Sequence, residues 1–361
     1  MANFFNSVHI TNFKSLKSVT LSDCKRINVL IGKPNVGKSN ILEAIGLHGL
    51  GHCHLNTNPK LTQFIRFENT PELFYDGNVN ELISVDIDIS ATNHIGGRPS
   101  KCRVKYLGSN VENITVPNLQ DKQLAIQFFD EEENSCSELL EELFVDDQFN
   151  VTMTNSSRIL GIKQYIFPTK LNLSGRNFPY LIPPHGANLH SVIQAEKTLR
   201  SDLADILSEY GLKINIDKSN HSLRVQSLKE LGDDIIFTLP YSSIADTLQR
   251  LIFFKTAIIS NVNSVLLFEE PEAHCFPPYI AHITQEVINA ETNQFFIATH
   301  SPYVLNDFME DENTRAELAI YMADFKDGQT VVYRLSDEEL NEVYNYGIDV
   351  FFNYERFTVH G

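Results

Sequence analysis

The chain of 361 residues has no apolar run that approaches the ~20 residues of a membrane-spanning helix. Its N-terminus, MANFFNSVHI, lacks the basic stretch and apolar core of a secretory signal peptide. An odd, scattered set of cysteines favours reduced thiols over a disulfide framework. The sequence therefore predicts a cytoplasmic protein that is not attached to a membrane. The five cysteines are Cys24, Cys53, Cys102, Cys136 and Cys275.

Positive charge is also scarce, because 46 acidic residues outnumber 29 lysines and arginines and give a net charge of −17. About half of this excess lies in residues 130–147, which contain nine acids and no base. General binding to nucleic acid needs Lys and Arg at the phosphates, so the composition does not favour it. We interpret Lys101, Arg103 and Lys105, which share one face of a predicted strand, as a solvated face.

What the sequence does contain is a phosphate-binding motif. Residues 32–39, GKPNVGKS, match the pattern G-x-x-x-x-G-K-[ST]. The apolar run at 27–31 predicts a strand before the motif, and the apolar spacing over 40–47 predicts a helix after it. The glycines let successive N–H groups converge on a phosphate, and the lysine and serine supply a cation and a Mg²⁺ ligand. We therefore expect ATP and Mg²⁺ to bind, with nucleotide contacts from Gly32, Asn35, Val36, Gly37, Lys38, Ser39 and Asn40.

Two further predicted strands end in polar residues that suit the same site. The run VLLFEEPEAH, at 265–274, ends in two adjacent carboxylates, which a bound cation would offset. Glu269 is expected to hold Mg²⁺ together with Ser39, and Glu270 to accept a proton from the attacking water. The run at 295–298 leads to His300, which could donate to the γ-phosphate. Glu270 and His300 are thus the predicted catalytic residues.

Together these pieces resemble the ABC-type ATPase heads of the RecF, SMC and OLD-nuclease group, including stand-alone ATP-binding heads of the AAA type. The resemblance rests on VHITNFKSLKSVTL near the start, the motif at 32–39, LLFEEPEAHCFPP and FIATHSP. It covers roughly residues 1–50 and 235–305. It implies an α/β fold: a P-loop NTPase head whose mixed sheet has flanking helices, with an antiparallel β lobe and a helical insert.

The resemblance also implies that two heads sandwich two ATP molecules, each held by one phosphate loop and by the signature helix of the other head. That helix is expected within LPYSSIADTLQRLIFFKTAI, with Ser242 or Ser243 at its cap and near the partner's γ-phosphate. Ala245 and Thr247 replace the usual signature glycines, which suggests slow hydrolysis. Either Gln63 or Arg66 is the candidate for the glutamine-loop contact.

We divide the sequence into an N-terminal half of the head at 1–80, a β lobe and insert at 81–230, and a C-terminal half at 231–361. The spacing predicts one amphipathic helix over 189–210. It also predicts strands at 318–322 and 330–335, then a last helix that begins with the capping box at 336–339. The sixty residues after His300 leave no room for the nuclease domain of OLD-type proteins.

A histidine-rich stretch, HGLGHCH at 48–54, contains His48 and His52 four residues apart, with Cys53 and His54 after them, which are residue types that bind metal ions. Its glycines interrupt the helix that would align the ligands, and no second ligand pair stands nearby, so metal binding there is not favoured.

The leading interpretation is an ATPase that dimerises on ATP, hydrolyses it slowly and controls a separate effector, a nuclease or toxin, in antiviral defence. A RecF-like DNA-repair ATPase that clamps DNA is the first alternative, although the net charge opposes it. A scaffold that binds ATP without turnover remains open. The absent signature glycines argue against a transporter subunit.

Overall fold

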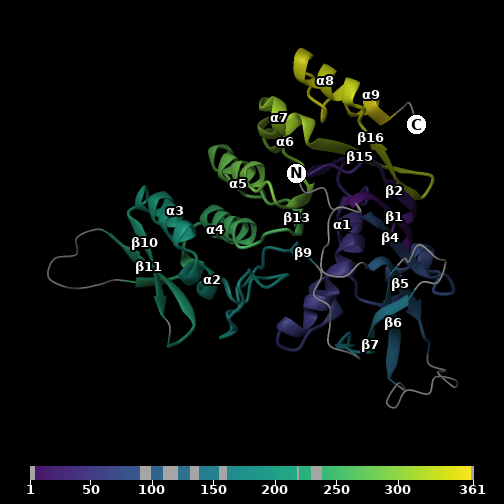
Figure 1. The fold of residues 1–361 in the computed structure, drawn as a ribbon, viewed down its shortest axis with the longest axis horizontal. Coiled ribbons are helices and arrows are strands. Elements are labelled where there is room, and N and C mark those ends of the chain that lie inside the picture. Colours follow the sequence, from purple (N-terminus) through teal and green to yellow (C-terminus); the bar gives the residue numbers. More distant parts are fainter. Residues whose placement is uncertain are drawn as a thin grey trace. The chain divides into compact units, whose positions relative to one another are not determined.

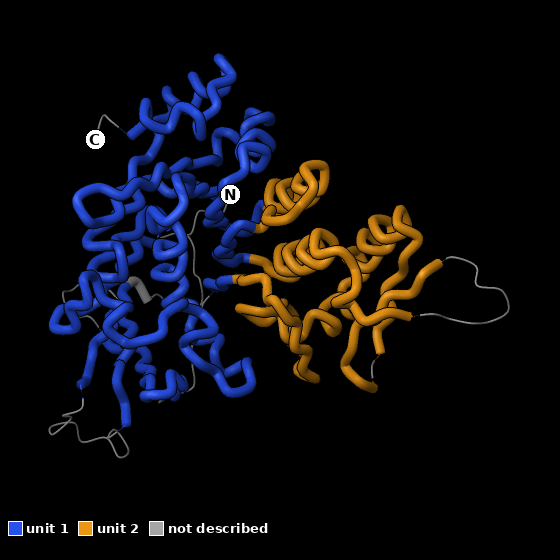
Figure 2. Tube along the Cα trace, turned by 180° about the vertical axis from the view of Figure 1, so that it is seen from behind, with its two compact units in different colours: residues 1–164, 263–270, 291–361 blue, residues 165–262, 271–290 orange. Residues whose placement is uncertain are grey.

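The computed structural model describes residues 5–89, 99–108, 121–130, 138–153, 161–217, 219–228 and 238–358. Their contacts divide the chain into two units, which Figure 2 colours separately. Unit 1 comprises residues 1–164, 263–270 and 291–361, and unit 2 comprises 165–262 and 271–290. This division differs from the three segments predicted from the sequence, since the β lobe falls in the same unit as the phosphate loop.

A six-stranded mixed sheet in unit 1 carries the predicted motifs (Figure 1). Its order is β16-β15-β3-β14-β13-β9, and β3 pairs in parallel with both β14 and β15, while β13 pairs in parallel with β14. The central strands are rich in apolar residues and almost fully buried, as expected where both faces of a sheet are covered. The strands are β3 (Ile27–Ile31), β9 (Ile162–Tyr165), β13 (Val265–Glu269), β14 (Gln294–Ala298), β15 (Leu318–Lys326) and β16 (Gln329–Arg334).

The second sheet of unit 1 is antiparallel and has the order β2-β1-β4-β5-β6-β7-β8. Alternate residues of its first strands are buried, as expected for a sheet with one face on the core. One cluster of buried residues joins this face to helix α1 and the mixed sheet. The strands are β1 (Phe5–Phe13), β2 (Leu16–Leu21), β4 (Ile83–Ile89), β5 (Pro99–Tyr106), β6 (Lys122–Asp130), β7 (Glu138–Asp146) and β8 (Val151–Met153).

The helices of unit 1 follow the strands of the mixed sheet. The predicted capping box is confirmed, because Ser336 accepts from the backbone N–H of Glu339 while the Glu339 carboxylate accepts from that of Ser336. The helices are α1 (Lys38–Gly46), α6 (Pro302–Glu310), α7 (Glu312–Ala316), α8 (Asp337–Tyr346) and α9 (Tyr354–Thr358). No helix among the described residues is long and apolar enough to cross a membrane.

Unit 2 combines helices with a small sheet of order β10-β11-β12. The single helix expected over 189–210 is wrong: α2 ends at Ala195 and α3 begins at Lys197, since Glu196 has an extended backbone. The elements are α2 (Leu189–Ala195), α3 (Lys197–Ser208), β10 (Leu212–Asp217), β11 (Ser222–Ser227), β12 (Thr238–Pro240), α4 (Asp246–Ile259) and α5 (Pro277–Asn289).

Candidate nucleotide site

The carboxyl ends of β3, β13 and β14 lie at one edge of the mixed sheet because these strands are parallel neighbours. This topology brings residues from 32–39, 269–270 and 300 around one cavity of about 700 Å³. That volume falls within the ~300–1,000 Å³ typical of small-molecule sites. Among the residues predicted to bind nucleotide, Asn35, Val36, Gly37, Lys38, Ser39 and Asn40 line it.

The phosphate loop turns sharply between β3 and α1. Asn35 and Gly37 have positive φ angles of 62° and 99°. A Cβ atom on Gly37 would lie 2.2 Å from the Thr330 hydroxyl oxygen, and one on Gly32 would lie 2.3 Å from the carbonyl oxygen of Ala323. Residues of β15 and β16 therefore lie so close to the phosphate loop that positions 32 and 37 require glycine.

Lys38 starts helix α1 and folds back over the loop. Its ammonium group donates to the carbonyl oxygens of Gly32 and Lys33, both at 2.9 Å. Burial lowers the pKa of Lys38 to about 8, although the carboxylates of Glu270 and Glu269 oppose the shift. The lysine thus stands as a partly desolvated cation at the loop, where a phosphate would stabilise its charge.

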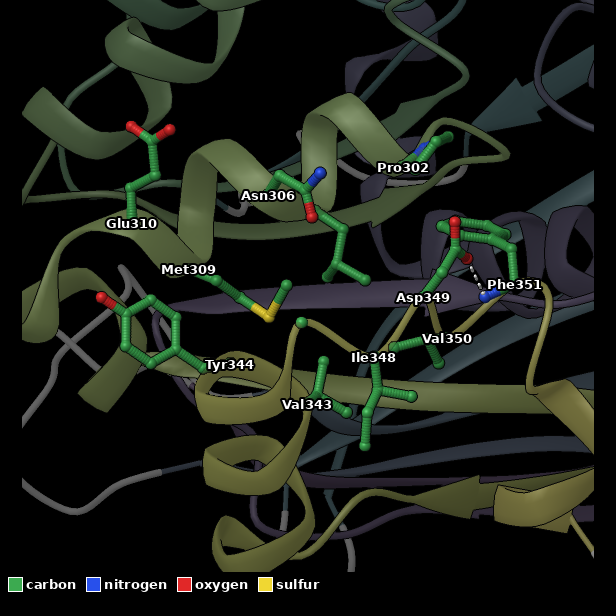
Figure 3. A pocket seen from close by; sticks show the side chains of 12 residues that line it. Pro302, Asn306, Met309, Glu310, Val343, Tyr344, Ile348, Asp349, Val350 and Phe351 are labelled. Atoms are coloured by element: carbon green, nitrogen blue, oxygen red, sulfur yellow. Dashed lines mark hydrogen bonds between the residues drawn. The ribbon is translucent and has the colours of Figure 1, made fainter.

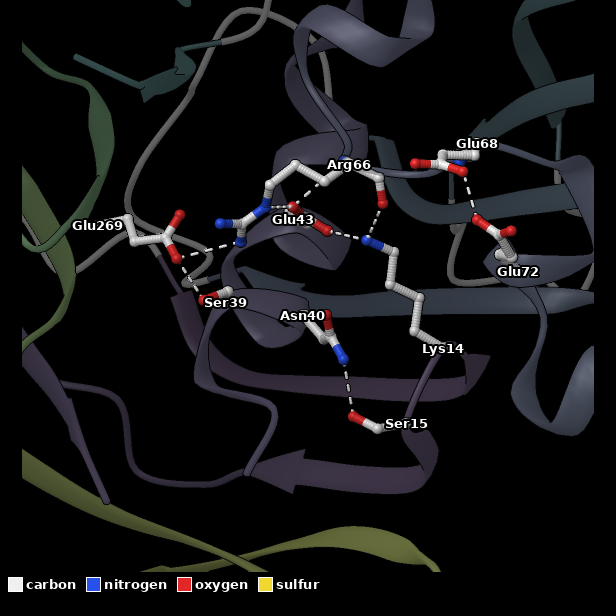
Figure 4. Close-up of polar contacts among 9 residues, drawn as sticks. All are labelled: Lys14, Ser15, Ser39, Asn40, Glu43, Arg66, Glu68, Glu72 and Glu269. Atoms are coloured by element: carbon white, nitrogen blue, oxygen red, sulfur yellow. Dashed lines mark hydrogen bonds and ion pairs between the residues drawn. The ribbon is translucent and has the colours of Figure 1, made fainter. Parts of the chain in front are cut away.

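Ser39 and Glu269 meet although 230 residues separate them in the sequence. The Ser39 hydroxyl donates to the Glu269 carboxylate (Figure 4). Hydroxyl and carboxylate oxygens are the hard ligands that Mg²⁺ prefers. This pair fits the expected magnesium site, and nucleotide phosphates would supply further oxygen ligands.

Glu270 and His300 form a second polar group at the same edge. Glu270 has a positive φ of 43°, and its carboxylate lies 3.6 Å from Nε2 of His300. Burial, followed by the charge of Lys38, lowers the pKa of His300, whereas Glu270 raises it. A neutral imidazole beside a carboxylate can orient a water molecule or donate one hydrogen bond.

An ionic network missed by the sequence interpretation adjoins this group. Glu43 on α1 is 1% exposed, and its carboxylate pairs with Lys14 and, at 2.7 Å, with Nε of Arg66. Arg66 also lies 3.0 Å from the Glu269 carboxylate, and Lys14 donates to the Arg66 carbonyl oxygen at 2.6 Å (Figure 4). The sequence marks Arg66 only as a glutamine-loop candidate, and Glu43 and Lys14 only as an acid inside an apolar helix and a lysine in the turn after β1.

Of the two glutamine-loop candidates, Arg66 lines the cavity. The Gln63 side chain instead accepts from the backbone N–H of Lys60. The helix-cap expectation for Ser242 and Ser243 is wrong, because both lie in a 3₁₀ turn and Ala245 occupies the cap of α4. Both serines are exposed on unit 2.

The histidine-rich stretch forms a 3₁₀ helix, Leu47–Leu55. His48 and His52 are buried. Nε2 of His48 is hydrogen-bonded to the carbonyl oxygen of Val85, and Nδ1 of His52 to that of Gly49. Within the described part of the chain, no three His, Cys, Asp or Glu side chains are grouped to hold a metal ion.

Comparisons with known proteins agree with this geometry. Residues 4–156 match the family described as an AAA ATPase domain. Residues 154–306 match an AAA domain family whose description names the AbiEii toxin and type IV toxin–antitoxin systems.

The chain is 25% identical over 238 residues to a DNA replication and repair protein RecF from Azobacteroides pseudotrichonymphae, which covers 65% of this chain and 64% of that protein. An SMC head bound to the C-winged helix domain of ScpA has a TM-score of 0.50 and 14% identity, covering 93% of this chain and 99% of that one. An SMC head with an extended coiled coil, bound to the C-terminal domain of ScpA derived from Pyrococcus furiosus, also gives 0.50, with 12% identity and coverage of 95% and 99%.

The phosphate loop, the carboxylate strand and the SMC-like fold define an ABC-type P-loop ATPase head. The similarities to a RecF protein and to SMC heads agree with the resemblance found in the sequence.

Proposed function

We propose that unit 1 binds Mg·ATP and hydrolyses it, and that the nucleotide state switches the chain between conformations that a partner recognises. The observation that carries the proposal is the contact between Ser39 and Glu269 beside the phosphate loop. It pairs two oxygen ligands from distant parts of the sequence at a helix N-terminus, where phosphate binds well. Mg²⁺, when bound there, would neutralise charge on the β- and γ-phosphates.

Four further residues would contact the phosphates or the attacking water. Lys38 would contact the β- and γ-phosphates after exchanging the carbonyl oxygens of Gly32 and Lys33 for phosphate oxygens. Glu270 would accept the proton of the attacking water, and His300, 3.6 Å away, would orient that water or donate to the γ-phosphate. Arg66 adds a second cation on the Glu269 side of the cavity.

We further propose that the head works as a homodimer or higher oligomer with ATP between the copies. The exposed pair Ser242 and Ser243, just before α4, would face the nucleotide of the second copy. The match to an AAA domain family whose description names a toxin–antitoxin system supports the proposal that the head controls a separate nuclease or toxin. An antiviral role remains part of this proposal.

A RecF-like function on DNA is the second candidate, and the 25% identity to a RecF protein favours it. A net charge of −17 opposes it, because phosphate contacts require cations. ATP-dependent binding of duplex DNA that weakens steeply with salt would favour this candidate over the effector switch.

Replacement of Glu270 by Gln tests the catalytic assignment. The amide cannot accept the proton, so we expect turnover to fall by about 10²–10⁴ while Mg·ATP still binds. ATP-bound dimers should then accumulate, which light scattering with size-exclusion chromatography would measure. The matched control is Glu272→Gln, in the turn after β13 but outside the cavity lining. Unchanged turnover in Glu270→Gln would place the base elsewhere.

A further inference from the structure

A second cavity in unit 1 lies away from the nucleotide site. This C-terminal pocket has a volume of about 410 Å³ and lies between α6 and the segment 343–351 (Figure 3). Its wall combines apolar and polar side chains, and Figure 3 shows the apolar Met309 of α6 facing Val343 and Ile348 across it. The volume suits one or two large apolar side chains rather than a whole domain.

Aromatic side chains stand exposed around the C-terminal pocket. Phe352, next to the lining residue Phe351, is 92% exposed, and Tyr346, next to Gly347, is 77% exposed. Tyr303 and Tyr344 are also exposed large side chains on α6 and α8. Exposed aromatic side chains beside a pocket with apolar lining residues are typical of an interaction site.

The charge of this surface restricts what can bind. The lining contains two acids, Glu310 and Asp349, and no lysine or arginine, and α6 carries a further acid at Asp307. Arg315 of α7 contacts one lining residue, because its guanidinium lies 3.7 Å from the centre of the Tyr344 ring. An aromatic ring at the edge of the pocket, that of Tyr344, thus already binds one guanidinium group. A second copy of the chain would bring the same acids, and nucleic acid would bring phosphates, so both would be repelled.

The pocket is connected to the phosphate loop through the chain that follows it. The Asp349 carboxylate accepts from the backbone N–H groups of Phe351 at 2.8 Å and Phe352 at 3.1 Å, which fixes the turn before α9. Tyr354, at the start of α9, donates its hydroxyl to the carbonyl oxygen of Ala323. The ammonium of Lys33, in the phosphate loop, lies 5.3 Å from the centre of the Tyr354 ring.

Ala323 links these contacts to the phosphate loop, because its carbonyl oxygen is the atom that leaves no room for a Cβ on Gly32. The Lys33 carbonyl oxygen in turn accepts from Lys38. A shift of the 348–352 segment would therefore reach the loop within a few contacts. Coupling requires that a ligand bind the two arrangements with different affinity.

We infer that the C-terminal pocket docks a basic, amphipathic segment of a partner protein, with an apolar anchor in the cavity and Lys or Arg over the acidic rim, and that Tyr354 couples this docking to nucleotide binding. The docking half is independent of the nucleotide. The coupling half rests on the proposed function, because it requires that ATP bind at the loop.

The docking test uses two synthetic helical peptides with the same Leu and Phe positions, one carrying Lys and Arg and the other Glu. Fluorescence anisotropy should show binding of the cationic peptide only. Asn306→Arg places a cation at the lining of the pocket and should weaken binding by about tenfold or more. Thr292→Arg, an exposed site outside the lining, makes the same charge change and should have little effect.

Equal binding of both peptides, or equal losses in the two arginine variants, would overturn the docking site. For the coupling, Mg·ATP should change the affinity of the cationic peptide by about fivefold or more, in either direction. Tyr354→Leu should keep peptide binding but abolish this change, and Tyr354→Phe, which loses only the hydroxyl, serves if Leu unfolds the chain. Failure to bind ATP would refute the proposed function alone, whereas ATP binding without any effect on the peptide would refute the coupling.

Discussion

The affinity for ATP should fall as the pH rises through about 8, because Lys38 loses its charge in that range. Burial in the phosphate loop lowers its pKa from 10.5 to about 8, against the opposing charges of Glu270 and Glu269. With that pKa, about nine-tenths of the chains carry the ammonium at pH 7, half at pH 8 and one-tenth at pH 9. If only the ammonium form binds, affinity drops about twofold from pH 7 to 8 and about tenfold from pH 7 to 9. An unperturbed lysine would leave affinity flat over this range.

Isothermal titration with excess Mg²⁺ from pH 7 to 9 would measure this loss. The terminal phosphate does not interfere, since its second pKa is near ~6. At pH 8 each ATP should take up about half a proton, which appears as a heat that depends on the buffer. Lys38→Met should bind weakly and without this pH dependence, and circular dichroism at each pH checks folding. Constant wild-type affinity up to pH 9 would contradict the lowered pKa or the contact of Lys38 with phosphate.

Two more predictions concern the cation in the cavity and the serine turn. Arg66→Ala should weaken ATP binding about tenfold. It should lower the free energy of unfolding by only about 1 kcal/mol, because the Arg66 side chain is 60% exposed and Lys14 still pairs with Glu43. The matched Gln63→Ala should change neither quantity, and equal losses in both variants would reject the phosphate role of Arg66. Ser243→Arg should leave ATP binding by monomers intact but block ATP-driven dimerisation. Mixing the Ser243→Arg protein with the Lys38→Met protein should recover part of the ATP turnover. Loss of ATP binding by the Ser243→Arg monomer would place Ser243 in the site of its own chain.

The sequence was sufficient where one short segment decides the structure. The runs at 27–31 and 265–268 are apolar except for Asn28, so they predicted buried strands, and the observed strands are Ile27–Ile31 and Val265–Glu269. The capping box at Ser336 was equally local. The break at Glu196 was not local in this sense, because neither proline nor glycine marks it and the apolar spacing runs through it.

The network around Glu43 shows why part of the site escapes prediction. Lys14 lies in the turn after β1, Glu43 in α1, and Arg66 in the segment between α1 and β4. Only the fold brings these three residues together. In the sequence, Glu43 is one acid in a helix that is otherwise mostly apolar. In the structure Glu43 is only 1% exposed, and a carboxylate removed from water needs cationic partners, so Glu43 holds Lys14 and Arg66 in place.

The adjacent carboxylates at 269–270 can be tolerated because the backbone separates them. Glu269 ends β13 in extended conformation and takes Ser39 and Arg66 as partners. The next residue has a φ of 43°, a left-handed conformation that costs a non-glycine residue ~1–2 kcal/mol. Its backbone N–H donates to the carbonyl oxygen of Ala298 at 2.8 Å, which holds the turn, and its carboxylate lies beside His300. Two like charges thus serve two different partners, one suited to a metal and one to a proton.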